Sequence, residues 1–165
     1  MHVSYNRVVS MINNFEQRCQ AAFPVVAFIA NRHLIDHMRR MSAALDMDID
    51  SALLWGLVAH MNVARSIVPG APASDVMGAD GSFGGELHPV KLADVTLVSG
   101  LPRETVRRKL ELLKKKGRIS KTKDGSWIHL ESGVDEQTIQ YTIDNIKRLV
   151  TAGKEIEAVL SQVNL

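Results

Sequence analysis

One segment in the middle of the chain, SGLPRETVRRKLELLKKKGRI at residues 99–119, most restricts the fold that this sequence can adopt. Within it, Val106, Leu110 and Leu113 recur four and three positions apart, which is the spacing of one buried face on an α-helix. The opposite face carries mostly charged side chains. We therefore predict an amphipathic helix over residues 102–116 that docks on its own domain by one side only.

The residues around this helix define its ends. Pro102 suits the first turn of a helix, and Gly117 suits the position just after a helix ends. The preceding run VKLADVTLV, residues 90–98, contains enough apolar residues for a short helix. Gly100 can adopt the positive φ that a tight turn between two helices requires. The sequence therefore predicts two helices joined by a tight turn.

A short basic segment, RISKTKDGSWIHL, follows the second helix. Two β-prone runs, residues 119–122 and 127–130, flank Asp124 and Gly125, and Asp-Gly between such runs is a strong hairpin signal. A helix, a tight turn, a second helix and a basic hairpin together predict a winged helix-turn-helix, with the wing at residues 119–130.

The N-terminal part of the chain is also predicted to be helical. Residues 1–68 form the predicted N-terminal helical region, a core or dimerisation region, with helices over residues 3–21, 24–45 and 51–68. The middle helix is expected to bury one apolar side within the chain. That side comprises Phe28, Ile29, Leu34, Ile35, Met38 and Met41.

Two further segments complete the predicted organisation. Residues 69–89, rich in Gly, Ala, Pro and Asp and without periodicity, are predicted to be a loop or linker. Residues 135–165 are predicted to be one long helix with apolar residues close to heptad spacing. A partner subunit would cover this stripe, or the N-terminal helices would. The stripe comprises Ile139, Ile143, Ile146, Leu149, Val150, Ile156, Leu160 and Val163.

These segments together predict a mainly α fold with a small β-hairpin wing. The winged helix-turn-helix domain occupies residues 90–130, between the N-terminal helices and the long C-terminal helix. The expected partner of the C-terminal helix is a second copy of the chain, so we predict a homodimer.

The net charge of +2 conceals an uneven distribution of charge. Residues 91–124 contain eleven Lys and Arg against four Asp and Glu, a net charge of +7, and the remaining residues carry −5. A polyanion such as double-stranded DNA would therefore meet a basic module on an acidic body.

The basic module also resembles a known family. GLPRETVRRKLELLKKKGRI is similar to the helix-turn-helix of the Crp/Fnr-type bacterial regulators, whose pattern is roughly G-L-S-R-E-T-V-x-R-x-L-x-x-L-x-x-x-G-x-I. The resemblance covers residues 90–130, and Pro102 departs from it by replacing the usual Ser. The helices around the module resemble a MarR-type regulator in arrangement only. The matching positions are Arg103, Glu104, Thr105, Val106, Arg108, Gly117 and Ile119.

The resemblance implies that Arg103, Glu104 and Arg108 read base edges in the major groove and that Thr105 contacts phosphate. The chemistry of the residues agrees, because guanine presents O6 and N7 to Arg and cytosine presents N4 to Glu. We add Arg107 to the predicted base-reading residues. Basic side chains near the end of the helix and on the wing suit phosphate. These are Lys114, Lys115, Lys116, Arg118, Lys121 and Lys123.

The sequence therefore predicts a cytoplasmic, bacterial-type transcription regulator that reads DNA. Two alternatives remain: a winged-helix protein-interaction module without specific DNA binding, and a regulator that also responds to a metal or a small-molecule effector. His33 and His37, four positions apart on a predicted helix, are the candidate metal ligands. They lack the further ligands of a recognisable motif, so we predict no metal site.

Other classes of function find little support. The sequence contains no nucleophile elbow, no P-loop and no dinucleotide fingerprint, so we predict neither enzymatic activity nor a cofactor. The longest apolar run, residues 21–30, is about half of what a bilayer-spanning helix needs, so no membrane partner is expected. The single cysteine, Cys19, allows no disulfide within one chain, which fits a reducing cytosol.

Overall fold

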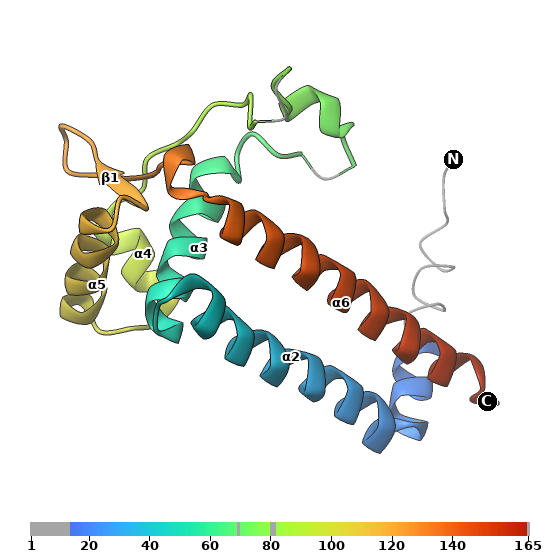
Figure 1. The fold of residues 1–165 in the computed structure, drawn as a ribbon. Helices are drawn as coiled ribbons and strands as arrows, with labels where there is room; N and C mark the ends of the chain where they lie inside the picture. The colour runs from blue at the N-terminus through green and yellow to red at the C-terminus, as the bar shows by residue number, and fades with distance from the viewer. Residues whose placement is uncertain (1–13, 69, 80–81, 165) are drawn as a thin grey trace. The chain divides into compact units, whose positions relative to one another are not determined.

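The structure is a computed structural model that describes residues 14–68, 70–79 and 82–164 (Figure 1). The predicted mainly α fold with a small β-hairpin is confirmed. Residues 14–21 are helical, and the earlier part of the helix predicted from residue 3 lies outside the described residues. The elements that follow are α2 (Phe23–Leu45), α3 (Ile49–Val63), the 3₁₀ turn η1 (Ala73–Val76), α4 (Leu92–Ser99), α5 (Arg103–Lys115), β1 (Ile119–Lys121), β2 (Trp127–His129), the 3₁₀ turn η2 (Glu131–Gly133) and α6 (Glu136–Ser161).

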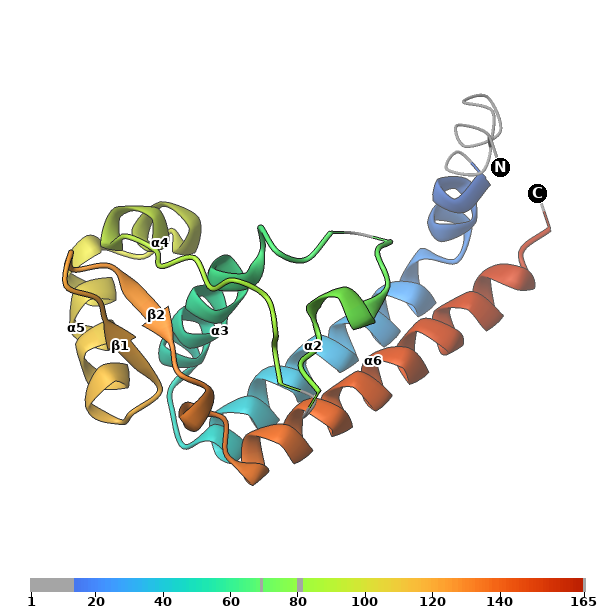
Figure 2. The same cartoon turned by 90° about the horizontal axis from the view of Figure 1, so that it is seen from above.

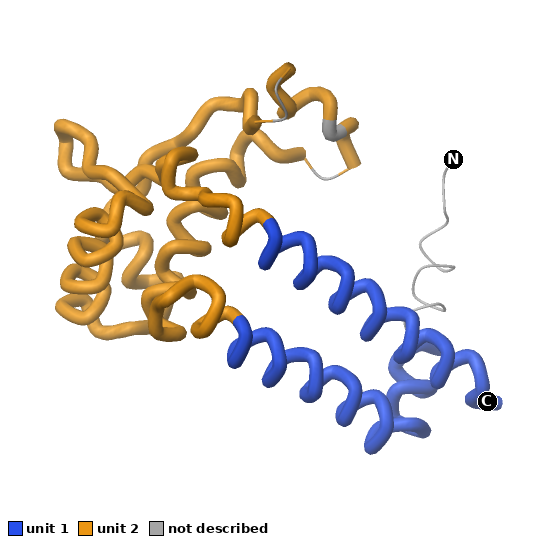
Figure 3. The backbone as a smooth tube through the Cα atoms, in the orientation of Figure 1, with its two compact units in different colours: residues 1–40, 140–165 blue, residues 41–139 orange. Residues whose placement is uncertain are grey.

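The chain divides into two compact units, which we describe separately (Figure 3). Residues 41–139 form one unit, and residues 1–40 together with residues 140–165 form the other. Among the described residues, no helix combines the length and the apolar content needed to cross a membrane.

The core of the unit formed by residues 41–139 lies where α3, α4, α5 and the hairpin meet (Figure 2). Helix α5 packs against α3, α4 and β1, and α3 also packs against β2. Each element contributes apolar side chains that are almost completely buried. These are Leu54 and Val58 from α3, Val95 from α4, Val106, Leu110 and Leu113 from α5, Ile119 from β1 and Trp127 from β2.

The hairpin pairs β1 with β2 in antiparallel register, with Ser120 opposite Ile128. Gly125 adopts a φ of 84° at the tip, which explains why the Asp-Gly pair marks this turn. Val90 adds a short bridge to β2, because its N–H donates to the Trp127 carbonyl at 2.9 Å and its carbonyl accepts from the Trp127 N–H at 2.7 Å. The segment that enters α4 is thus fixed to the hairpin.

A buried asparagine joins α3 to the hairpin and to the segment before α4. The side-chain amide of Asn62 donates to the His88 carbonyl at 2.8 Å and accepts from the His129 N–H at 2.7 Å. The His88 N–H donates to the Asn62 carbonyl at 2.8 Å. Three segments distant in sequence therefore share one hydrogen-bonding side chain in the core.

The segment predicted as a linker has local structure where it is described. After η1, Met77 pairs with Phe83 in an isolated β-bridge. The Gly84 N–H donates to the Val76 carbonyl at 2.9 Å, and the Gly78 N–H donates to the Ser82 carbonyl at 2.8 Å. The glycines permit this close approach, because a Cβ on Gly84 would lie 3.0 Å from the Gly78 nitrogen.

In the other unit, α2 buries only part of the face that its apolar residues predict. Val26 and Ile29 are buried, but Phe28, Leu34 and Ile35 are more than half exposed, so the prediction that they are buried within the chain is wrong. The physical reason is that α2 meets α6 through its polar side chains, which are described below.

Candidate nucleic-acid interface

The turn between α4 and α5 has the geometry that the sequence predicts. Gly100 takes the left-handed conformation with a φ of 67°, and its N–H donates to the Thr96 carbonyl at 3.2 Å. Pro102 is the N-cap residue of α5, and the Val106 N–H donates to its carbonyl at 3.0 Å. The helix therefore begins one residue later than predicted, at Arg103.

Helix α5 separates its apolar residues from its charged ones. Val106, Leu110 and Leu113 are almost completely buried against the rest of the unit. Thr105 is half-buried, at the edge of the exposed face. The predicted base-reading residues, which are all exposed, are Arg103, Glu104, Arg107 and Arg108.

Two of these four residues are paired with each other. The Arg107 guanidinium donates from Nε to Glu104 Oε2 at 2.8 Å and from Nη2 to Glu104 Oε1 at 2.6 Å. The pair lowers the pKa of Glu104 and raises that of Arg107, mainly through this hydrogen bonding. The guanidinium groups of Arg103 and Arg108 form no hydrogen bond or ion pair with any described residue, so they are available to a partner.

Lys109 has a structural role that sequence reasoning missed. Its side chain, 9% exposed, lies on the buried side of α5, where Nζ is 2.5 Å from Asp48 Oδ1 and 3.7 Å from Asp50 Oδ2. Asp48 also caps the N-terminus of α3, because it accepts from the Ser51 N–H at 3.0 Å. Hydrogen bonding to Lys109 is the main cause that lowers the pKa of Asp48 to about 2. This ion pair fixes α5 to the start of α3.

The basic side chains predicted to contact phosphate divide into two groups. Lys114, Lys115 and Lys123 are exposed and form no ion pair with any described residue. Lys121 is also exposed, although its Nζ lies 3.2 Å from Glu111 Oε1 and 4.7 Å from the centre of the Trp127 ring. These four side chains lie at the end of α5 and on the hairpin, as the sequence predicts.

The remaining two basic side chains bind within the unit. Arg118, 16% exposed, donates to the Gly133 carbonyl, pairs with Asp135 Oδ2 at 3.0 Å and lies 4.8 Å from the centre of the Trp55 ring. The prediction that Arg118 contacts phosphate conflicts with this placement, because its guanidinium already has three partners. Lys116 donates to the Asp46 carbonyl at 2.8 Å.

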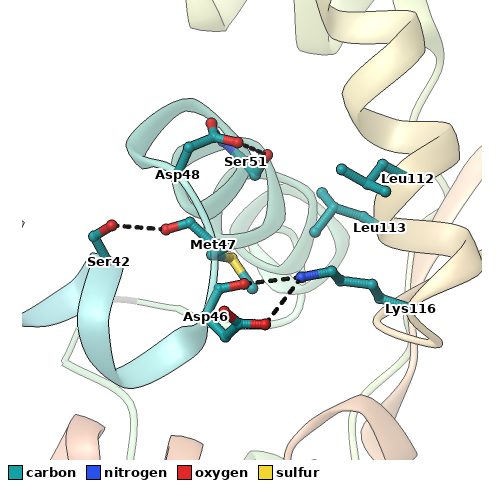
Figure 4. A pocket seen from close by; sticks show the side chains of 8 residues that line it. All are labelled: Ser42, Asp46, Met47, Asp48, Ser51, Leu112, Leu113 and Lys116. Atoms are coloured by element: carbon teal, nitrogen blue, oxygen red, sulfur yellow. Dashed lines mark hydrogen bonds and ion pairs between the residues drawn. The ribbon is translucent and has the colours of Figure 1, made fainter.

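A hollow of about 410 Å³ with a mixed polar and apolar lining lies beside the C-terminal end of α5 (Figure 4). Lys116 and Asp46 close one side of it, and Asp46 has a positive φ of 48°, which is uncommon for a residue other than glycine. None of the predicted base-reading residues lines the hollow. Its lining comprises Ser42, Asp46, Met47, Asp48, Ser51, Leu112, Leu113 and Lys116.

The two candidate metal ligands lie in the other unit. The rings of His33 and His37 stack with their centres 6.4 Å apart. His37 Nδ1 lies 2.8 Å from Asn145 Oδ1 and 2.9 Å from the Tyr141 hydroxyl, so this nitrogen already has protein partners. Within the described residues, no group of three or more His, Cys, Asp or Glu side chains is arranged to hold a metal ion.

The chain was compared with models of protein families, with curated proteins and with solved structures, and none of the three comparisons found a match. The interpretation of this site therefore depends on its own geometry and chemistry.

Proposed function

We propose that this chain is a sequence-specific DNA-binding transcription regulator with a winged helix-turn-helix. Helix α5 would enter the major groove, and the hairpin would lie near the sugar–phosphate backbone. One observation carries the proposal: α5 buries Val106, Leu110 and Leu113 and leaves an exposed basic face directly after a tight turn from α4. An α-helix fits the major groove, and arginine is the side chain best suited to read guanine there.

The states of the four candidate base-reading residues suggest different roles. Arg103 and Arg108 are free to bind O6 and N7 of guanine without breaking an ion pair. Arg107 and Glu104 would first have to exchange their mutual hydrogen bonds for contacts with bases. A cytosine N4 opposite Glu104 would supply a replacement donor, so this exchange would favour particular sequences.

Phosphate contacts would come from the exposed lysines. Lys114 and Lys115 follow the base-reading residues along α5, and Lys121 and Lys123 lie on the hairpin. Such contacts add affinity and orientation without sequence information. Thr105, at the edge of the same face, would contribute a hydroxyl.

We also propose that the regulator acts as a homodimer in the cytoplasm. Two copies related by a twofold axis would place their α5 helices about 34 Å apart and would read an inverted repeat. No cofactor, metal or enzymatic step enters this proposal.

The test is selection of bound sequences from a pool of random duplexes, followed by titration of an enriched site at several salt concentrations. We expect an enriched inverted repeat and a steep decrease in affinity as salt rises. Binding without an enriched motif would contradict sequence-specific regulation, and absence of binding at low salt would contradict DNA binding altogether.

One feature favours a second candidate function, a protein-interaction module. On α4, Leu97 is 82% exposed and Val98 is 58% exposed, beside a hollow of about 450 Å³ that Met61 and Ala64 also line. Exposed apolar side chains next to a hollow are typical of a protein-binding surface. Failure to bind DNA at low salt would favour this function over the first.

A further inference from the structure

The N-terminal part of the apolar stripe predicted on α6 is exposed, and no described residue covers it, whereas toward the C-terminal end Ile156 is half-buried and Leu160 is buried. The side chains in this exposed part are between 42% and 54% exposed, although they are among the most hydrophobic in the protein. Their spacing of four, three and four residues is the heptad spacing of a helix that packs along another helix. We call this exposed part the α6 stripe, and it comprises Ile139, Ile143, Ile146 and Val150, with Leu149 next to it.

The opposite side of α6 faces α2 and is polar. Helices α2 and α6 run side by side (Figure 2). Long polar side chains join them. His37 contacts Tyr141 and Asn145, Arg40 Nη1 donates to Asp144 Oδ2 at 2.8 Å, and Arg32 pairs with Glu155. These contacts fix which side of α6 meets α2.

Positions on an α-helix advance by 100° per residue, so the two sets of side chains on α6 can be compared directly. The residues that contact α2, from Tyr141 to Glu155, cluster on one side of the helix. The stripe from Ile143 to Val150 lies on the opposite side, about 180° around the helix axis. Since α2 is already engaged by the polar side, the stripe needs a partner from outside this pair of helices.

We propose that two copies of this chain form a dimer in which their α6 stripes pack against each other. The two α6 helices run antiparallel. This inference deepens the proposed function, since it assigns the dimer surface of the proposed regulator. A twofold axis between Ile143 and Ile146 places Ile143 opposite Ile146 of the second copy and Ile139 opposite its Val150. Every large apolar side chain of the stripe then meets another one, as a self-complementary interface requires.

The charges at the ends of the stripe favour the same arrangement. In the antiparallel register, Glu136 lies opposite Gly153 and next to Lys154 of the second copy. Gly153 leaves open space there, because a Cβ built on it meets nothing within 4 Å. Glu136 and Lys154 therefore form two opposite-charge pairs, one at each end. A parallel dimer would instead place Glu136 beside Glu136 and Lys154 beside Lys154, which repel each other.

The first experiment measures the oligomeric state of the full chain by sedimentation equilibrium without DNA. Ile146→Glu places a charge at the centre of the interface, and we expect its dimer dissociation constant to rise at least a hundredfold. Ala158→Glu adds the same charge on an exposed position of α6 away from the stripe and is expected to leave dimerisation unchanged. A dimeric Ile146→Glu protein would overturn the proposal, as would a monomeric parent protein.

A charge exchange tests the antiparallel direction. Glu136→Lys and Lys154→Glu should each weaken the dimer about tenfold, and the double variant should recover the parent affinity, because the opposite charges meet again. In a parallel dimer each of these residues faces its equivalent in the second copy, so either exchange would only replace one like-charge pair by another. Two single variants with unchanged dimer affinity would therefore overturn the antiparallel arrangement. Circular dichroism at 222 nm verifies that each variant retains its helices.

The outcomes separate this inference from the proposed function. The parent protein could be a dimer that Ile146→Glu dissociates and yet bind no DNA. That result would support the α6 interface and contradict the DNA-binding function. A monomeric parent protein that binds DNA with an enriched single half-site would overturn the α6 interface and leave DNA binding supported.

Discussion

The ammonium group of Lys109 reaches from the buried side of α5 to the carboxylate of Asp48, which caps the N-terminus of α3. The two ends of this ion pair have different surroundings, because the Lys109 side chain is 9% exposed and that of Asp48 is 56% exposed. Loss of Asp48 therefore leaves a buried charge without its main partner, whereas loss of Lys109 leaves a carboxylate that water can solvate.

This asymmetry predicts unequal effects of the two substitutions on stability. Asp48→Ala removes both the helix cap and the partner of Lys109, and we expect the free energy of unfolding to decrease by about 2 kcal/mol or more. Lys109→Met replaces the buried charge by an apolar side chain of similar length and should decrease it by less than about 1 kcal/mol. Urea unfolding measures both, and equal effects would contradict the assigned asymmetry.

Stability should also depend on pH in the acid range. The pKa of Asp48 in the folded protein is about 2, below its ordinary value of 3.8, mainly because of Lys109. The pKa of Asp135 is also about 2, mainly because the Thr138 hydroxyl donates to it. A carboxylate with a lowered folded-state pKa stabilises the protein above pH 3.8, and this contribution disappears as the pH decreases toward 2.

The prediction is tested by measuring the free energy of unfolding between pH 2 and pH 5 for the parent protein, Asp48→Asn and Asp135→Asn. The difference between parent and each variant should be largest at pH 5 and should shrink steadily toward pH 2. A difference that stays constant over this range would show that ionisation of the carboxylate does not contribute to the free energy of unfolding.

If α5 reads bases, Arg108→Ala should weaken binding to the selected site by about 1–3 kcal/mol and relax the base preference at one position. The Arg108 guanidinium forms no hydrogen bond or ion pair with the described residues, so the loss would come from the DNA contact and not from a disturbed helix. Competition titrations with single-base variants of the site measure both effects. Unchanged affinity together with an unchanged preference would rule out base reading by Arg108.

Alanine substitutions at Lys115 and Arg118 should have different effects, although both residues are basic and lie three positions apart. Lys115→Ala should weaken binding to all sequences alike and reduce the slope of log affinity against log salt by about 1. Arg118→Ala should instead lower the free energy of unfolding, because its guanidinium binds Gly133, Asp135 and the Trp55 ring. A salt slope reduced equally by both variants would mean that Arg118 leaves these partners and contacts DNA.

Local patterns in the sequence predicted the elements that depend on local rules. The spacing of Val106, Leu110 and Leu113 is enough to place α5 and its buried side, since helical periodicity fixes both. Gly100 marked the turn, and Asp124-Gly125 marked the hairpin, because each position needs a backbone conformation that few residues adopt.

Contacts between distant segments were not predictable in the same way. Asp48 is a residue type that commonly caps helices, but nothing in its local sequence indicates that Lys109, sixty-one residues later, is its partner. Arg118 has the same local appearance as the exposed lysines near it, and only the tertiary fold directs it inward. Phe28 and Ile35 show the converse, because periodicity identifies an apolar face and leaves open whether the chain itself covers that face.

The hydrogen bonds of Asn62 affect how well the chain can accept insertions and deletions between residues 62 and 88. They join α3 directly to His88 and His129, so the two ends of the segment between residues 62 and 88 are held together at the core. We therefore expect the geometry of the hairpin and of α4 to depend little on the length of that segment. Insertions or deletions within it should be tolerated, which makes this loop a natural place for related chains to vary and for a second domain to be inserted.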